Sequence, residues 1–229
     1  MSVFKKETDL VEFLAEKIRF QSYYKEVYPN INLASREFYP YWRKWFSRDP
    51  SDFLYPLAQP QIDIIVVDKD HQLLGVEVKY LKFNKKSPRP TLPFYKGIEQ
   101  TLALLRFGFI CVSLWQCFDF EEASGDLGVV RRYMSATHEL VNLLKLPINY
   151  SSLWITKGKG KNEATYLHFP YTSWFDNKSH FKLPPQLPPL HGKENPLQSM
   201  QQVKRMNEFL RISLKIPLPK DQSQTPSSQ

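Results

Sequence analysis

The sequence predicts an α/β domain in which a mixed central sheet lies between layers of helices. Segments whose apolar residues recur at helical spacing alternate along the chain with short runs rich in Val, Ile and Leu. The run IDIIVV is apolar almost throughout, which is typical of a strand buried on both faces. The 229 residues, 42% of them hydrophobic and 14% aromatic, suffice for one good-sized domain with a real core.

The first third of the chain is predicted to contain two helices followed by a β-hairpin. An amphipathic helix is expected over residues 8–24, capped by Thr8 or Asp9. A second, aromatic-rich helix is expected over residues 35–46, with Pro40 near its start. The strands IDIIVV and LLGVEVKYL then flank the polar turn DKDH. No clear strand is recognisable ahead of this hairpin.

The alternation of helices and strands continues through the middle of the chain. A basic loop, KFNKKSPRPTLP, follows the hairpin. The elements expected beyond this loop are a helix over residues 94–107, a strand over 107–118, a helix over 130–145 and a hairpin over 151–169 that turns at 157–162. The last hairpin and a later helix are expected to be additions to the central α/β core.

The composition changes beyond Phe169, where prolines cluster. The stretch KLPPQLPPLHGKENP is predicted to be extended, with no packed core of its own. The expected organisation is one domain over residues 1–175, a proline-rich extended segment over 176–196, a helix over 197–216 and a disordered tail over 217–229.

The bulk composition narrows the class of protein. A net charge of +8 favours polyanionic partners such as nucleic acid. Cys111 and Cys117 both lie in a hydrophobic segment, which argues for a reducing compartment rather than a disulfide framework. The amino terminus has no apolar signal core and no apolar run approaches about 18 residues, so a cytoplasmic protein without membrane contact is expected. No phosphate-binding glycine motif is present, which argues against a nucleotide cofactor.

The predicted hairpin carries a group of charged residues that suits phosphodiester hydrolysis. Glu77 and Lys79 share one face of the second strand, because side chains two apart point the same way. Asp63 lies on the first strand, where the hairpin can set it across from Glu77. Two carboxylates at that range suit Mg²⁺ or Mn²⁺, and Lys79 would orient or help deprotonate the attacking water. The alternatives are a Glu77–Lys79 salt bridge or an ordinary solvated strand face.

Asp63, followed by Glu77, Val78 and Lys79 on a hairpin, resembles the PD-(D/E)XK nuclease superfamily, which includes restriction endonucleases and Holliday-junction resolvases. The resemblance runs from about residue 5 to residue 118 and lacks only the strand ahead of Asp63. Pro60 stands three residues before Asp63, whereas the family proline usually adjoins the aspartate. The resemblance implies a restriction-endonuclease-like three-layer core of helix, three strands, helix and strand. It also implies an endonuclease that hydrolyses DNA with a Mg²⁺-activated water and leaves a 5′-phosphate.

Two further site residues follow from the resemblance. Many members carry a glutamate at the start of the first helix. At about 100° per residue, Glu7 projects along the apolar stripe, whereas Glu12 and Glu16 point nearly opposite. Glu7 is therefore the expected third metal ligand, and the alternative is a first-turn acid favoured by the helix dipole. Resolvase-like members also carry a glutamine on the helix after the lysine, which here is Gln100, unless it is a core-edge residue bonded to backbone.

The basic residues near the predicted site are candidates for contacts with the DNA backbone, with a solvated basic loop as the alternative. They are Lys82, Lys85, Lys86, Arg89 and Lys96. The rival to a nuclease is a catalytically inactive subunit with the same fold that binds DNA or serves assembly. A third possibility is a coincidental hairpin on a protein that binds RNA or a protein partner. A homodimer stays open, because cutting both strands often requires two copies.

Overall fold

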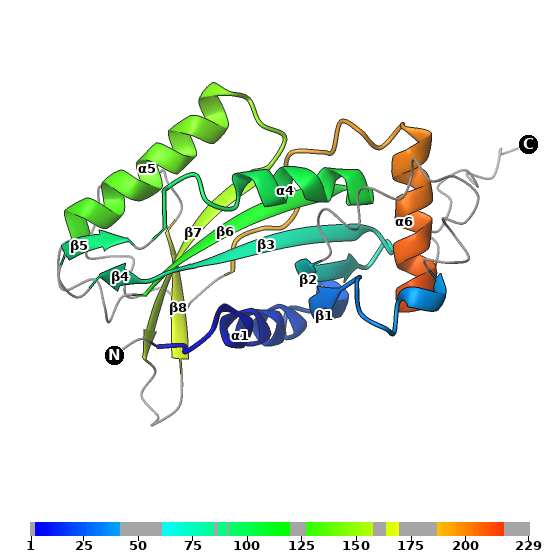
Figure 1. Ribbon diagram of the computed structural model, residues 1–229, viewed down its shortest axis with the longest axis horizontal. Coiled ribbons are helices and arrows are strands. Elements are labelled where there is room, and N and C mark those ends of the chain that lie inside the picture. Colours follow the sequence, from blue (N-terminus) through cyan, green and yellow to red (C-terminus); the bar gives the residue numbers. More distant parts are fainter. Residues whose placement is uncertain are drawn as a thin grey trace, which may run out of the picture.

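The computed structural model describes residues 3–41, 61–84, 87–90, 92–119, 127–157, 164–169 and 187–217. A six-stranded sheet forms its centre, in the order β1-β2-β3-β6-β7-β8 (Figure 1). The strands are β1 Tyr24–Asn32, β2 Gln61–Asp68, β3 Leu73–Leu81, β6 Cys111–Asp119, β7 Asn149–Lys157 and β8 Ala164–Phe169. β1, β2 and β3 are antiparallel, β6 and β7 run parallel to β3, and β8 is antiparallel to β7. The predicted α/β class with a mixed sheet is therefore confirmed.

Helices cover both faces of this sheet (Figure 1). α1 lies on one face, α4 and α5 lie over the other, and α6 stands beside one end of the sheet. The helices are α1 Glu7–Arg19, α4 Ile98–Leu104 with the 3₁₀ turn η2 Leu105–Phe107, α5 Leu127–Leu143 and α6 Gln201–Leu214. None of the helices in the described ranges combines the length and apolar character needed to cross a membrane.

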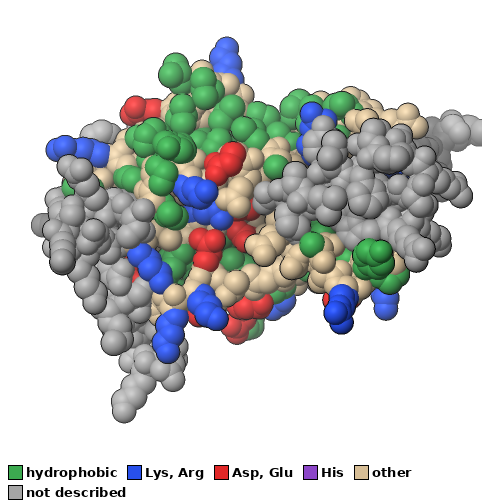
Figure 2. All heavy atoms as spheres, viewed as in Figure 1, with side chains coloured by type: hydrophobic (Ala, Val, Ile, Leu, Met, Phe, Trp, Pro, Cys, Tyr) green, Lys and Arg blue, Asp and Glu red, His purple; other side chains and the backbone are tan. Residues whose placement is uncertain are grey.

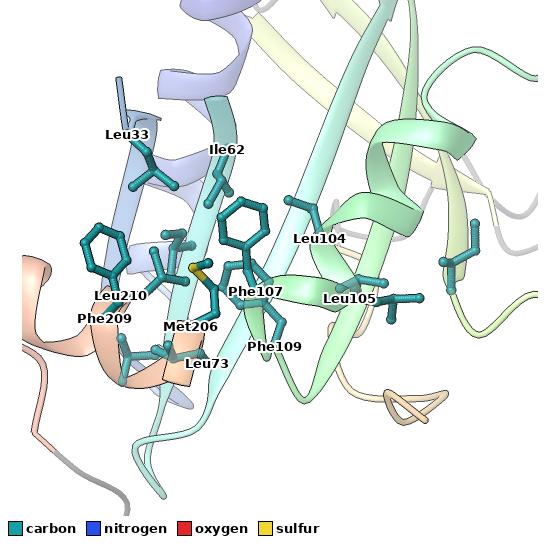
Figure 3. Packing of buried hydrophobic residues seen from close by; sticks show 14 of the residues in the cluster. Leu33, Ile62, Leu73, Leu104, Leu105, Phe107, Phe109, Met206, Phe209 and Leu210 are labelled. Atoms are coloured by element: carbon teal, nitrogen blue, oxygen red, sulfur yellow. The ribbon is translucent and has the colours of Figure 1, made fainter. Parts of the chain in front are cut away.

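The alternation of side chains along the central strands divides the core into two main clusters. Val76 and Val78 of β3 pack with the apolar stripe of α1. Leu73, on the other face of β3, packs with Phe107, Phe109 and residues of α6 (Figure 3). Glu77 and Lys79 alternate with these valines along β3 and lie on its opposite face, on the α4 side.

The strand that the sequence did not reveal ahead of Asp63 is β1. The predicted helix over residues 8–24 ends early, at Arg19, and Tyr24 already begins β1. Only Val27 of β1 is buried, so the strand shows no alternating apolar pattern. Pro29 lies within it, which an edge strand tolerates because its outer side needs no ladder hydrogen bond. The apolar pattern of the sequence therefore does not indicate this strand, which is held in place by backbone pairing with β2.

The middle elements differ from the predicted ones at their ends. The helix expected over 94–107 begins only at Ile98, because residues 94–97 form a turn that closes with Gly97 in the left-handed region. The expected strand over 107–118 begins at Cys111, and the expected helix over 130–145 begins earlier, at Leu127. The basic loop contains a short two-stranded ribbon, β4 Phe83–Asn84 with β5 Ser87–Pro90.

The C-terminal part contributes to the same core as the sheet. Leu187 and Leu190, from the proline-rich segment, are buried in the α1-side cluster. Asn195 donates to the carbonyls of Leu105 and Phe109, at 2.8 and 2.9 Å. α6 then supplies buried residues to the other cluster. The described part of the segment over 176–196 thus packs against the domain.

Several expectations fall partly outside the described residues. The hairpin over 151–169 is present as β7 and β8; of its predicted turn at 157–162, Lys157 is the last residue of β7 and the rest lies outside the described residues. Of the helix expected over 35–46, residues 35–38 are turns and 39–41 are helical, and the rest lies outside. Residues 176–186 and the tail from 218 onward also lie outside.

Candidate active site

The candidate site lies where β3 runs past the end of its pairing with β2. The last paired residues are Ile64 and Val76. Beyond them, Asp63 Oδ2 accepts a hydrogen bond from the Val78 amide at 2.7 Å. Glu7 Oε2 likewise accepts from the Tyr80 amide at 2.7 Å. Because these amides are two residues apart, they lie on the same edge of β3, where carboxylates replace a neighbouring strand.

Lys79 lies among the three predicted carboxylates. Its Nζ lies 2.7 Å from Glu77 Oε1 and 3.4 Å from Glu7 Oε1. The side chains of Glu77 and Lys79 are only 2% and 8% exposed, whereas that of Glu7 is 37% exposed. The structure thus brings together Asp63, Glu77, Lys79 and Glu7, and the Glu77–Lys79 contact foreseen as an alternative is also present. Figure 2 shows acidic side chains at the middle of one face, with basic side chains near them.

Burial shifts the protonation of the two deepest carboxylates. Desolvation, reinforced by the charge of Asp63, raises the pKa of Glu77 to about 8, although Lys79 opposes the shift. Desolvation also raises the pKa of Asp63 to about 6, against the lowering effects of Lys79 and the Val78 amide. Without a further cation, Glu77 therefore keeps its proton at neutral pH, and its 2.7 Å contact with Lys79 is a true ion pair only at higher pH.

Lys79 remains an ammonium under the same conditions. Burial alone would lower its pKa, but the charges of Glu77, Asp63 and Glu7 outweigh burial and raise it. A lysine held in the charged form donates hydrogen bonds and offsets negative charge. Its pKa therefore favours charge stabilisation and orientation of water over the proton-accepting role that the sequence also allowed.

Glu77→Gln is expected to stabilise the protein above pH 8 and to change it little near pH 4.5. Because the folded pKa of Glu77 is raised from 4.5 to about 8, the folded state binds more protons than the unfolded state between these values. Stability therefore falls as pH rises through this window, by on the order of a few kcal/mol. Unfolding midpoints from pH 4.5 to 9 measure this, with the exposed Glu16→Gln as control. Parallel curves for wild type and Glu77→Gln would contradict the assignment.

The start of α4 closes over the stem of Lys79. Gly97 adopts φ 97°, and a Cβ there would lie 2.7 Å from Leu114 Cδ1 and 2.8 Å from Lys79 Cγ. A glycine is therefore required at position 97 for two reasons: the backbone there is left-handed, and a side chain would collide with Lys79.

Gly97→Ala is expected to destabilise the protein by about 1–2 kcal/mol or more, and to displace the Lys79 side chain. The exposed Gly128, near the start of α5, offers the control, since Gly128→Ala should be neutral or stabilising by up to about 1 kcal/mol. Chemical denaturation measures both, and equal stability of the two variants would exclude this packing constraint.

Gln116, a residue that sequence reasoning missed, anchors the turn before α4. Its side chain is fully buried, and its Nε2 donates to the carbonyls of Phe94 and Lys96 at 2.7 and 3.3 Å. The Tyr150 hydroxyl donates to its Oε1 at 3.0 Å, and the Thr137 hydroxyl lies 3.1 Å from the same oxygen. Gln116 pairs with Lys79 across the parallel strands, so the network fixes the turn directly beside the candidate site. A lone buried glutamine on an apolar strand is the signal that could have revealed it.

A second missed group holds the beginning of the chain against the sheet. The Tyr80 hydroxyl donates to Asp119 Oδ2, and the same oxygen accepts from the Val3 amide at 2.8 Å. The Phe4 amide donates to the Tyr80 hydroxyl at 3.1 Å. This arrangement, here called the amino-terminal latch, fixes the entry to α1 and hence the position of Glu7.

The structure does not join Gln100 to the carboxylates. Gln100 is half-buried, and its Oε1 is a buried atom without a hydrogen-bond partner among the described residues. Of the predicted DNA-contacting residues, Lys82 Nζ donates to the Lys5 carbonyl at 2.7 Å. Lys96 Nζ lies 3.3 Å from Glu99 Oε1, with both side chains well exposed. Lys85, Lys86 and the side chain of Arg89 lie outside the described residues.

The carboxylates of Asp63, Glu77 and Glu7 do not form a preformed metal-binding site. Among the residues the structure describes, no group of three or more His, Cys, Asp or Glu side chains is arranged to hold a metal ion. Glu7 is directed to the Tyr80 amide and to Lys79. Its place as a third metal ligand beside Asp63 and Glu77 therefore stays a prediction.

The chain has little detectable similarity to known proteins. No protein-family model and no curated protein matches the sequence. Among solved structures, the chain is similar to that of Pyrococcus furiosus SfsA in complex with Ca²⁺, with a TM-score of 0.27 and 13% identity. The match covers 47% of this chain and 48% of the SfsA chain. A similarity of this degree establishes neither a shared fold nor a shared activity.

Proposed function

We propose that this chain is a metal-dependent endodeoxyribonuclease of the PD-(D/E)XK type, with a restriction-endonuclease-like core. The cluster of half-buried Asp63 with buried Glu77 and Lys79, at the end of the hairpin, carries the proposal. The order α1, β1, β2, β3, α4, β6 supports it, because it matches the helix, three strands, helix and strand of that core. The net charge of +8 suits a DNA substrate.

The residues present fit a divalent cation. Three carboxylates face one lysine, and the pKa values of Asp63 and Glu77 are raised, mainly by burial and further by the neighbouring carboxylates, so a cation beside them would stabilise their ionised forms. Asp63 and Glu77 would hold Mg²⁺ or Mn²⁺, since Mg²⁺ commonly takes one or two carboxylates together with substrate phosphate. When bound, the metal would supply Lewis-acid stabilisation and an activated water.

The chain's own residues then have separate tasks in the proposed reaction. Lys79, as an ammonium, would orient the attacking water and offset the charge that develops on the phosphate. Glu7, through Lys79 and the Tyr80 amide, would hold Lys79 and the edge of β3 in place. Lys82 and Lys96 are the described candidates for contacts with the DNA backbone. Gln100 stays a candidate for the network, since its buried Oε1 has no described partner.

Cleavage assays on plasmid, linear, branched and single-stranded DNA, with Mg²⁺, Mn²⁺ or EDTA, test the proposal. We expect metal-dependent products with 5′-phosphate ends, which EDTA and Glu77→Gln abolish. Because metal binding must displace the Glu77 proton, cleavage should increase as pH rises from about 6 to 8. Cleavage that survives Glu77→Gln would contradict the site assignment.

An inactive DNA-binding or assembly subunit is the second candidate function. One observation favours it: each carboxylate already has a partner within the protein, namely the Val78 amide, Lys79 or the Tyr80 amide. Such a self-contained cluster would need no metal. Binding of DNA with neither cleavage nor a metal-induced rise in unfolding temperature, in any metal tested, would select this alternative.

A further inference from the structure

A small cavity opens directly beside the candidate active site. It has a volume of about 180 Å³ and lies between the start of α1 and the adjoining ends of β1 and β2. Glu7 and Asp63 are among its lining residues, so it shares two side chains with the site already described. Asp63 is the next residue of β2 after Ile62, which pairs with Ile31 of β1. The cavity therefore lies on the β1 side of Asp63, whereas Glu77 and Lys79 lie on the β3 side.

The lining of the cavity defines the chemistry of its occupant. Val11 and Ile62, both buried, and Ile31, half-buried, give it an apolar floor. Thr8, Asn32 and Gln61, all exposed, give it a polar uncharged rim. Among the described residues that line it there is no Lys, Arg or His. An anionic phosphate would meet the two carboxylates of Glu7 and Asp63 there and no cation of the described lining, which disfavours a phosphate as the occupant.

An uncharged, flat and hydrogen-bonding group fits this lining. A cavity of about 150 Å³ accommodates a benzene ring, so 180 Å³ has room for a ring of pyrimidine size. The apolar floor suits the face of such a ring, and the rim suits its polar edge. Asn32 Oδ1 already accepts from the Ala34 amide at 3.0 Å, which leaves its NH₂ group to donate to a ring oxygen or nitrogen.

We propose that this cavity holds one nucleobase of the strand being cut, next to the scissile phosphate. The inference rests on the proposed function, because it takes the phosphate to lie at Asp63, Glu77 and Lys79. In a duplex each base is stacked and paired, so a base can enter the cavity only after it leaves the helix. Because leaving the helix costs least for a base that is already unpaired, the preferred substrate class is DNA with an unpaired nucleotide at the cut: single-stranded, branched or frayed.

Oligonucleotides with 2-aminopurine at successive positions test the pocket independently of cleavage. The Glu77→Gln protein binds them without cutting, and binding is followed by fluorescence anisotropy. We expect 2-aminopurine emission to change at one position and to stay nearly constant at the others. Ile31→Trp, which fills the cavity, should abolish that response, and Asn32→Ala should weaken it. Lys25→Trp, an exposed substitution on the same strand and not among the cavity's lining, is the matched control and should retain it.

Cleavage by the wild-type chain supplies the second measurement. An abasic residue at the responding position should slow cutting by about tenfold or more, because it lacks the base that the cavity would hold. If the cavity held the sugar instead, the abasic residue would not slow cutting, because it keeps its sugar. Blunt duplex should be cut more slowly than single-stranded or branched DNA. Two results would overturn the pocket: binding without a response at any position, or an Ile31→Trp variant that folds and behaves like Lys25→Trp. A position-specific response without any wild-type cleavage would instead refute the nuclease and leave the pocket standing.

Discussion

Lys79→Met is expected to lower the rate of DNA cleavage by about 10²–10³-fold, because it removes the charge that stabilises the developing negative phosphate. The substitution also raises the pKa of Glu77 further, since Lys79 is the group that lowers it. The loss of Lys79 likewise raises the pKa of Asp63, so both carboxyls shift toward the neutral form instead of remaining as unpaired charges. We therefore expect only a moderate loss of stability, about 1–3 kcal/mol, from the lost hydrogen bonds.

Binding and catalysis should separate in this variant. At a pH above the further raised pKa of Glu77, where the carboxylates ionise, removal of a neighbouring cation does not weaken the attraction for Mg²⁺. The metal-induced rise in unfolding temperature should therefore persist while cleavage is lost. The double variant Lys79→Met with Glu77→Gln controls for stability, because it removes both members of the pair. Lys79→Met cleaving within about tenfold of wild type would exclude the catalytic role.

Asp63 offers a pair of substitutions that separates charge from hydrogen bonding. Asp63→Asn keeps an oxygen that can accept from the Val78 amide, whereas Asp63→Ala leaves that amide without its partner. Both should lose metal-dependent cleavage by at least about a hundredfold, since a metal contributes several kcal/mol and each 1.36 kcal/mol is a factor of ten.

Relative to wild type, Asp63→Asn and Asp63→Ala should change the free energy of unfolding differently. Because the pKa of Asp63 is raised to about 6, ionised Asp63 is unfavourable in the metal-free fold, and Asp63→Asn should be neutral or stabilising above pH 6. Asp63→Ala should cost about 1–3 kcal/mol, from the unsatisfied amide. Denaturant titrations at pH 5 and 8 make the comparison. Equal losses in both variants would show that Asp63 acts only through packing.

The residues that the sequence revealed are those whose geometry is local. Glu77 and Lys79 share a strand, and the hairpin that carries Asp63 closes through a short turn, so alternation alone placed them together. Glu7 was predicted because the family resemblance implies a glutamate at the start of the first helix, and a helical projection distinguishes Glu7 from Glu12 and Glu16. All four lie in one cluster.

The features that the sequence did not reveal depend on distant partners. β1 is held by pairing with β2, and its polar, proline-containing sequence carries no pattern of its own. Gln116 matters because β6 places it beside Lys79 while α5 and β7 supply Thr137 and Tyr150. Gly97 is required by a contact with Lys79 that exists only after α4 has docked. Residue propensities and hydrophobic periodicity do not predict such contacts between elements.

The amino-terminal latch bears on when the site can form during synthesis. Glu7 accepts a hydrogen bond from the Tyr80 amide, and the Tyr80 hydroxyl donates to Asp119. The Val3 amide donates to the same Asp119 oxygen, across 116 residues of sequence. A nascent chain that has exposed Asp63, Glu77 and Lys79 still lacks this anchor until the end of β6 has left the ribosome. At roughly 5–20 residues per second, several seconds separate the first of these residues from Asp119. The geometry of the proposed site would thus be completed only after the end of β6 has emerged, later than its charged side chains themselves.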